Sequence, residues 1–167
     1  MVAENKRRHV RAPLLAKIII VCNDATEVRF ARNISLSGLF IESINPLSVD
    51  TKVSLLFPLH HPEKTVSVKA KVVRTVAPVT DNDGTIPGMG MEFTDVSFDS
   101  SVLIDDYIVK IKNIYEELSI LFDVINPDLK RLSYLIKKSG IQKYSDMMEL
   151  REIVKKESLA LGLVSFK

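Results

Sequence analysis

The chain has 167 residues, of which 46% are hydrophobic and 26% are charged, with 6 Gly and 7 Pro. This composition excludes wholesale disorder, and a formal net charge of +2 is too small for a protein that coats nucleic acid. A single cysteine excludes an internal disulfide, and the longest apolar run, Leu14 to Cys22, is far too short to span a bilayer. We therefore expect a cytoplasmic protein without a membrane span or a secretory signal.

Basic residues gather at the start of the chain, in the stretch KRRHVRAP. Lys6, Arg7, Arg8 and Arg11 fall within six positions, and Glu4 is the only acidic residue among the first 17. Residues 1–12 are therefore interpreted as a basic N-terminal arm. By itself such a charge run is usually a solvated tail.

Short apolar segments separated by Asn, Asp, Pro and Gly predict β-strands from residue 14 to residue 94. Several short strands with turns between them are typical of a small closed antiparallel barrel, which leaves no open sheet edge. We assign residues 13–97 to this barrel. The six predicted strands are Leu14–Cys22, Glu27–Ile34, Gly38–Glu42, Lys52–Pro58, Thr65–Val76 and Met89–Phe93.

A helical pattern begins near residue 100, so residues 98–167 are predicted to form a helical region and the fold class is α+β. Apolar residues from Ile104 to Ile125 recur at intervals of 4 and 3, which predicts a long amphipathic helix over about 100–125. Pro127 favours a new helix start, and two shorter helices are expected over about 127–138 and 144–161.

The apolar stripe of the long helix needs a partner. It could pair with its copy in another chain, or the two later helices could fold back over it. The regular spacing favours a homo-oligomer, whereas further apolar residues beside the stripe favour folding back, and the sequence leaves both arrangements open.

Residues that could support catalysis or hold a metal are not in the required patterns. The three histidines and the single cysteine lack the spacing of a zinc site, and no Gly-x-Ser-x-Gly elbow is present. We expect no enzyme activity, no metal and no cofactor. A short basic arm without interleaved aromatic residues also argues against binding to DNA or RNA.

The stretch NISLSGLF lies where the second predicted strand ends and the third begins. Asn33 and Ser35 can hydrogen bond to nearby backbone, and Gly38 permits unusual dihedral angles or close approach of another molecule. Taken alone, these residues are typical of a hairpin corner.

Together, Arg7-x-x-x-Arg11 and Asn33-x-Ser35-x-x-Gly38 resemble the two signature motifs of the PilZ domain, a bacterial receptor family for cyclic di-GMP. The stretch GMGMEFTDVS from residue 88 is similar to the closing strand of that family, so the resemblance covers about residues 5–97. Each motif alone is weak, but their order and spacing make the combination specific.

The resemblance implies a site for a ligand with two phosphates and two guanines. A guanidinium can grip phosphate oxygens, pair with guanine O6 and N7, or stack on a base. By this resemblance the arm would bind guanine and phosphate, and the hairpin would hydrogen bond to the ligand and hold the turn. The implied binding residues are Arg7, Arg8, Arg11, Asn33, Ser35 and Gly38.

The expected function is a cyclic di-GMP receptor that passes its signal to an unidentified downstream protein by contact. The alternative is a ligand-blind adaptor with the same barrel, acting as an oligomerising interaction module through the 100–125 helix. This alternative arises because some members of the family serve only as protein-binding modules.

Overall fold

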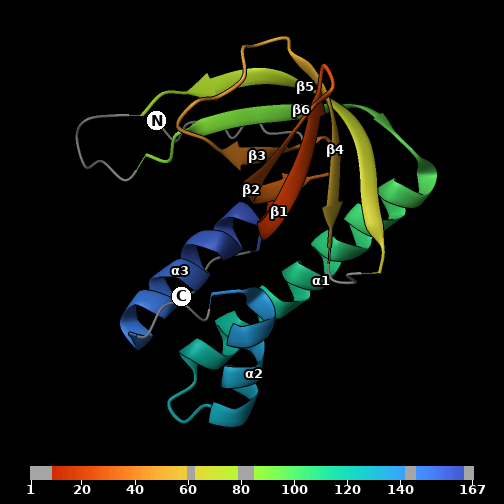
Figure 1. Ribbon diagram of the computed structural model, residues 1–167. Helices are drawn as coiled ribbons and strands as arrows, with labels where there is room; N and C mark the ends of the chain where they lie inside the picture. The colour runs from red at the N-terminus through yellow and green to blue at the C-terminus, as the bar shows by residue number, and fades with distance from the viewer. Residues whose placement is uncertain (1–8, 60–62, 79–84, 142–145, 164–167) are drawn as a thin grey trace. The chain divides into compact units, whose positions relative to one another are not determined.

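The computed structural model describes residues 9–59, 63–78, 85–141 and 146–163. Six strands are followed by three helices (Figure 1). The chain divides into two compact units. The barrel unit is Pro13–Ile108, and the helical unit is Val109–Lys167 together with Met1–Ala12.

The six strands form a closed barrel in the order β1-β2-β3-β6-β5-β4, which confirms the predicted fold. The registered pairs β1–β4, β2–β3, β3–β6, β4–β5 and β5–β6 are all antiparallel. The strand bounds are β1 Ala12–Cys22, β2 Ala25–Ser35, β3 Gly38–Glu42, β4 Lys52–Pro58, β5 Thr65–Val76 and β6 Gly88–Val96.

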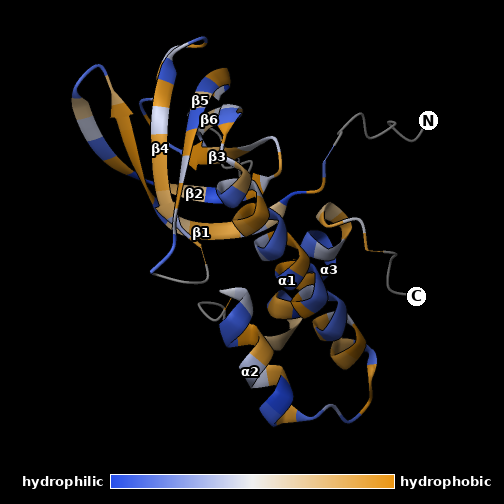
Figure 2. Cartoon of the chain, turned by 90° about the vertical axis from the view of Figure 1, so that its right-hand side faces the viewer, coloured by the Kyte–Doolittle hydropathy of each residue, from blue (hydrophilic) through white to orange (hydrophobic). Residues whose placement is uncertain are grey.

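The barrel core follows from the alternation of apolar and polar residues along the strands. In β5 the side chains of Val66, Val68, Ala70 and Val72 are buried, and polar residues stand between them. The residues that fill the interior from β4 are Val53, Leu55 and Phe57. Alternate burial of this kind places one face of each strand inside the barrel. Figure 2 colours the strands and helices by the hydropathy of each residue.

The first turn of the barrel has unusual backbone geometry. Asn23 and Asp24, which join β1 to β2, both have positive φ, at 46° and 66°. A two-residue hairpin with positive φ at both positions matches the right-handed twist of its strands, and Asn and Asp tolerate that conformation.

The first part of α1 (Phe98–Asp123) packs against the strands within the barrel unit. The hydroxyl of Ser100 donates to the carbonyl oxygen of Ser67 in β5 at 3.2 Å. The hydroxyl of Tyr107 donates to the carbonyl oxygen of Pro13 in β1 at 2.7 Å, and burial raises the pKa of Tyr107. These two contacts attach the helix to two different strands.

In the helical unit, α2 (Leu129–Ser139) and α3 (Met147–Ala160) fold back against α1. The guanidinium of Arg131 grips the carboxylate of Glu117 with two contacts of 2.5 and 2.6 Å. Between α1 and α3, the hydroxyls of Ser119 and Ser158 lie 3.0 Å apart. The apolar residues buried by these three helices include Ile111, Tyr115, Leu118, Leu132, Leu135, Leu150 and Val154.

Most of the apolar stripe of α1 is buried within one chain, inside the barrel unit up to Ile108 and inside the helical unit from Ile111 on. From Ile104 to Leu118 the stripe residues are buried, whereas Ile125, beyond the end of the helix, is 95% exposed. Of the two arrangements left open by the sequence, the structure has the second. A homo-oligomer through residues 100–125 stays a prediction that this packing does not support.

Helix α2 has well-defined ends. At its start the carboxylate of Asp128 accepts from the backbone N–H groups of Lys130 and Arg131, at 2.9 and 3.1 Å. At its end Gly140 has φ of 80°, a left-handed conformation that stops the helix. Neither α2 nor any other helix in the described parts of the chain has the length and apolarity needed to cross a bilayer.

Candidate ligand-binding site

The first motif is described only in part. Arg7 and Arg8 lie outside the described residues, whereas Arg11 is half-buried and directly precedes β1. Arg11 belongs to the helical unit, and the second motif belongs to the barrel unit. The assembly of both motifs into one site is therefore a proposal, taken up below.

The second motif forms the hairpin between β2 and β3. Ser35 pairs with Gly38 across the two-residue loop Leu36-Ser37. The Ser35 hydroxyl is buried, donates to the carbonyl oxygen of Gly38 at 3.2 Å and lies 3.3 Å from the Ser37 hydroxyl. A buried hydroxyl with this partner stabilises the turn, and its oxygen keeps acceptor capacity.

Gly38 is required by a neighbouring strand. Its φ is not in the left-handed region, but a Cβ atom at this position would overlap the carbonyl oxygen of Met91 in β6. Gly38 and Glu92 are register partners, so β3 and β6 approach closely here. The absence of a side chain at Gly38 therefore allows the β2–β3 hairpin to pack against β6.

A β-bulge in β2 turns Asn33 toward the outside of the barrel. The register shifts between Ala31 and Asn33, so Arg32 is an extra residue in the strand. Ala31 and Ile34 are both fully buried, which simple alternation cannot produce. Because a bulge re-aims the side chains that follow it, Asn33 faces outward between two inward residues.

Strand register places Asn33 in a row with residues from three other strands. Asn33 lies opposite Phe40 of β3, Phe40 lies opposite Gly90 of β6, and Gly90 lies opposite Arg74 of β5. Residues that are directly opposite in a sheet point to the same face. Leu39 and Ile41, the neighbours of Phe40 along β3, point into the barrel core, so this row lies on the other face of the strand, where Phe40 is itself covered and only 8% exposed.

Phe40 and Arg74 form a cation–π pair within that row. The central carbon of the Arg74 guanidinium lies 5.4 Å from the centroid of the Phe40 ring. A Cβ atom on Gly90 would come within 2.8 Å of Arg74, and one on Gly88 within 2.7 Å of Phe40. Because Gly88 and Gly90 have no side chains, the side chains of Phe40 and Arg74 can lie against the backbone of β6.

Sequence reasoning did not single out Phe40 and Arg74 as candidate residues. A signal was present in β5, because alternation from Val66 to Val72 would place Arg74 inside the apolar core. An unpaired arginine is not tolerated there, so a bulge had to intervene. The structure has that bulge, as a register shift between Val72 and Arg74.

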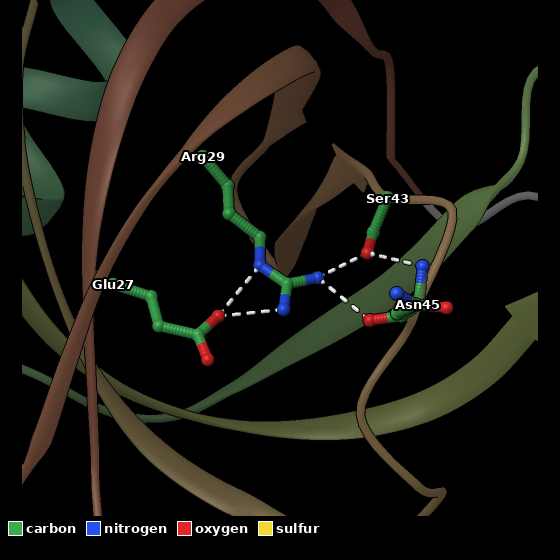
Figure 3. A network of polar contacts seen from close by, with 4 residues as sticks. All are labelled: Glu27, Arg29, Ser43 and Asn45. Atoms are coloured by element: carbon green, nitrogen blue, oxygen red, sulfur yellow. Dashed lines mark hydrogen bonds and ion pairs between the residues drawn. The ribbon is translucent and has the colours of Figure 1, made fainter.

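Two other arginines on the barrel are occupied by internal partners. Figure 3 shows Arg29, which donates to the carboxylate of Glu27 at 2.6 and 2.8 Å, to the hydroxyl of Ser43 and to the carbonyl oxygen of Asn45 at 2.8 Å. Arg32 forms an ion pair with Glu42. These contacts tie β2 to β3 and to the segment after it. By contrast, no carboxylate lies within ion-pair distance of Arg74 in the part of the chain that the structure describes.

The described residues contain no group of three or more His, Cys, Asp or Glu side chains that could hold a metal ion. The groups that remain accessible on the outer face are an amide, Asn33, and a guanidinium, Arg74, which the buried ring of Phe40 supports. Such groups bind a polar, planar or anionic ligand by hydrogen bonding, charge and stacking.

Solved structures resemble the fold at low identity. MotI/DgrA of Bacillus subtilis, an inhibitor of motility, is 18% identical with a TM-score of 0.54, and the match covers 66% of this chain and 53% of that one. The PilZ domain of YcgR from Escherichia coli, solved with c-di-GMP, is 16% identical with a TM-score of 0.52, covering 68% and 96%. The MrkH–c-di-GMP complex of K. pneumonia is 15% identical with a TM-score of 0.51, covering 68% and 55%.

This chain therefore spans about half the length of the MotI/DgrA and MrkH chains, and at these identities the likenesses show the fold. A comparison with curated proteins finds no match. The family model of the PilZ domain, however, matches residues 5–110, which is more than half of the chain and includes both sequence motifs. The closed barrel and this match together show that the chain belongs to the PilZ domain family.

Proposed function

We propose that this protein is a receptor for cyclic di-GMP that passes its signal by contact with a partner protein. The observation that carries the proposal is the outer-face row of the barrel, in which a bulge turns Asn33 outward beside the Phe40–Arg74 pair. Membership of the PilZ family supports the same ligand, and relatives in that family have been solved with c-di-GMP.

The ligand and these residues are chemically complementary. The arm arginines Arg7, Arg8 and Arg11 would neutralise the two phosphates and pair with guanine edges. Asn33 would donate from its amide and accept at its carbonyl oxygen, and Ser35 would hold the hairpin and offer its remaining lone pair.

Arg74 would add a second cationic surface from the barrel side. Its guanidinium lies on Phe40, which leaves the other side of the plane available to a base and the edge available to a phosphate. Because Arg74 already packs against the Phe40 ring and the backbone of Gly90, its side chain would lose little further rotamer freedom when the ligand binds.

Charge supplies the switch in this proposal. Lys6 and the arm arginines repel one another until phosphates neutralise them, so the ligand favours an ordered arm. Fixing the arm costs about 1–2 kcal/mol per backbone residue, which several charge-assisted contacts together would offset. As a receptor for a second messenger, the protein would act in the cytoplasm and without catalysis of its own.

The ligand-blind, oligomerising adaptor is the less favoured function. It depends on the stripe of α1 to join two chains, and that stripe is buried from Ile104 to Leu118 within one chain. The adaptor hypothesis also gives no role to the outward-facing side chain of Asn33.

Calorimetric titration with cyclic di-GMP at physiological salt tests the proposal, with GTP as the control ligand. Wild type should bind saturably at micromolar or lower concentration, and Arg11→Ala should bind at least tenfold more weakly while the barrel stays folded. Arg151→Ala, which removes an arginine from α3, is the matched control and should bind like wild type. Failure of the wild type to bind would refute the receptor function.

A further inference from the structure

Helix α2 carries a strongly basic exposed face. Between Leu129 and Ile141 the sequence contains four cations and no acidic residue. At 100° per residue, the cations and Tyr134 occupy a sector of about 120° with the tyrosine at its centre, whereas Leu132 lies on the opposite side and Leu135 flanks the sector. We call this sector the α2 face; its residues are Lys130, Arg131, Tyr134, Lys137 and Lys138, all of them exposed.

The side chains of the α2 face are organised around the tyrosine ring. The Arg131 guanidinium carbon lies 5.4 Å and the Lys138 ammonium nitrogen 5.6 Å from the centroid of the Tyr134 ring. The ring is half-exposed, at 51%. These cation–π contacts hold two positive charges beside an aromatic side chain in open solvent.

Most of the positive charge on this face has no ion-pair partner among the residues that the structure describes. Arg131 is paired with Glu117, but no carboxylate among the described residues lies within ion-pair distance of Lys130, Lys137 or Lys138. The helix is anchored by two buried side chains, Leu132 and Leu135, which are only 3% and 2% exposed. The helix is therefore fixed in place with three unneutralised lysines pointing outward.

We propose that the α2 face is the docking surface for an acidic segment of a partner protein. Charge complementarity calls for carboxylates opposite Lys130, Lys137 and Lys138, and a central tyrosine with a neighbouring arginine has the composition of a protein-interface hot spot. The inference rests on the contact-signalling part of the proposed function, and it is independent of the ligand site.

Two other anionic partners fit the face less well. A nucleic acid would need the Tyr134 ring for base stacking, yet two cations already lie over that ring. Helices that lie on an anionic membrane insert their apolar face, and the apolar face of α2 is packed inside the helical unit.

The test uses the full chain, isotope-labelled for amide NMR. The probe is a helical peptide of about 20 residues with glutamates four positions apart, at about 0.15 M salt. Vesicles that contain phosphatidylglycerol and a single-stranded DNA of about 20 nucleotides are the competing probes. The peptide should shift the amide signals of residues 130–138, and its dissociation constant should rise at least fivefold when Lys137→Glu and Lys138→Glu are combined.

The matched control combines Lys155→Glu and Lys156→Glu, a neighbouring pair of exposed lysines on α3. It introduces the same charge change in the same unit and should leave the peptide affinity within twofold of wild type. Equal weakening by both double variants, shifts outside α2, no shifts at all, or tighter binding of α2 to vesicles or DNA than to the peptide would each overturn the proposal.

Titration of the same variants with cyclic di-GMP separates the two ideas. Ligand affinity should be unchanged by the α2 substitutions. A wild type that binds the peptide on α2 but not cyclic di-GMP would refute the receptor function and leave the docking surface standing, and the reverse result would refute the docking surface alone.

Discussion

The guanidinium of Arg74 lies over the ring of Phe40, although 33 residues separate them and they belong to strands that do not pair with each other. Strand β6 lies between their strands and contributes Gly90, whose lack of a side chain lets Arg74 reach across. The pair stands in the row that Asn33 begins. The row therefore runs from Asn33 of the second motif in β2 to Arg74 in β5.

Arg74→Ala should weaken cyclic di-GMP binding by about tenfold or more, because one charged, stacked contact is worth about 1.5–3 kcal/mol. Arg74→Lys should recover only part of this loss, since an ammonium keeps the charge without the planar fork. Calorimetry measures both. Lys69→Ala, which removes an exposed cation from the same strand, should not change the affinity, and an unaltered affinity in Arg74→Ala would exclude Arg74 from the site.

Gly38→Ala should destabilise the barrel by about 1–3 kcal/mol or more, because the added methyl overlaps the backbone of Met91 and neither strand can move freely. The free energy of unfolding from urea denaturation reports the change. Gly140→Ala is an informative comparison, since nothing lies within 4 Å of its Cβ position and only its φ of 80° opposes a side chain. Its cost should be about 1 kcal/mol, from helix termination alone.

Ser35→Ala should reduce stability by about 0.5–1.5 kcal/mol, because the buried hydroxyl donates to the Gly38 carbonyl oxygen. If the serine also meets the ligand, cyclic di-GMP affinity should fall several-fold under conditions where the variant is fully folded. Ser37→Ala removes the second partner of that hydroxyl, 3.3 Å away, and should cost less because the bond from Ser35 to Gly38 remains. A stability loss without any change in affinity would limit Ser35 to a structural role.

Tyr107→Phe should lower stability by about 0.5–1.5 kcal/mol at neutral pH through loss of the hydrogen bond to Pro13. Burial raises the pKa of Tyr107 above its unfolded value of about 10, so folding favours the neutral phenol. That stabilisation is complete below pH 10 and is lost as the pH rises beyond it. Denaturation curves at pH 8 and pH 11 should therefore show a smaller alkaline loss in the phenylalanine variant than in wild type.

Glu117→Gln should loosen α2 from α1 at neutral pH. The hydrogen bonds from Arg131 lower the pKa of Glu117, so the pair stabilises the fold above the ordinary glutamate range, near pH 4.3, and this contribution is lost as the pH falls through the lowered value. The melting temperatures of wild type and variant should differ at pH 7 and converge at strongly acidic pH. Glu116→Gln, one residue away and exposed, should match wild type at both.

Much of this fold could be predicted because its signals are local. Alternating apolar residues from Val66 to Val72 define a barrel strand by themselves, and the 4-and-3 spacing after Ile104 defines α1. The turn at Asn23-Asp24 and the end of α2 at Gly140 depend on the conformational preferences of single residues. The motif residues of the hairpin were recognisable for the same reason, since their spacing along the chain is itself the signal.

Three features depended on contacts between distant segments. The bulges that turn Asn33 and Arg74 outward arise from register between strands, which composition does not encode. Gly38 is needed because β6 passes against it, and not because of its own dihedral angle. The stripe of α1 has the same spacing whether it meets a second chain or its own helices, and only the packing of α2 and α3, with Arg131 on Glu117, decided between them. Local periodicity determines which face of an element is apolar, whereas the partner of that face is decided by which long-range contacts bury the most of it.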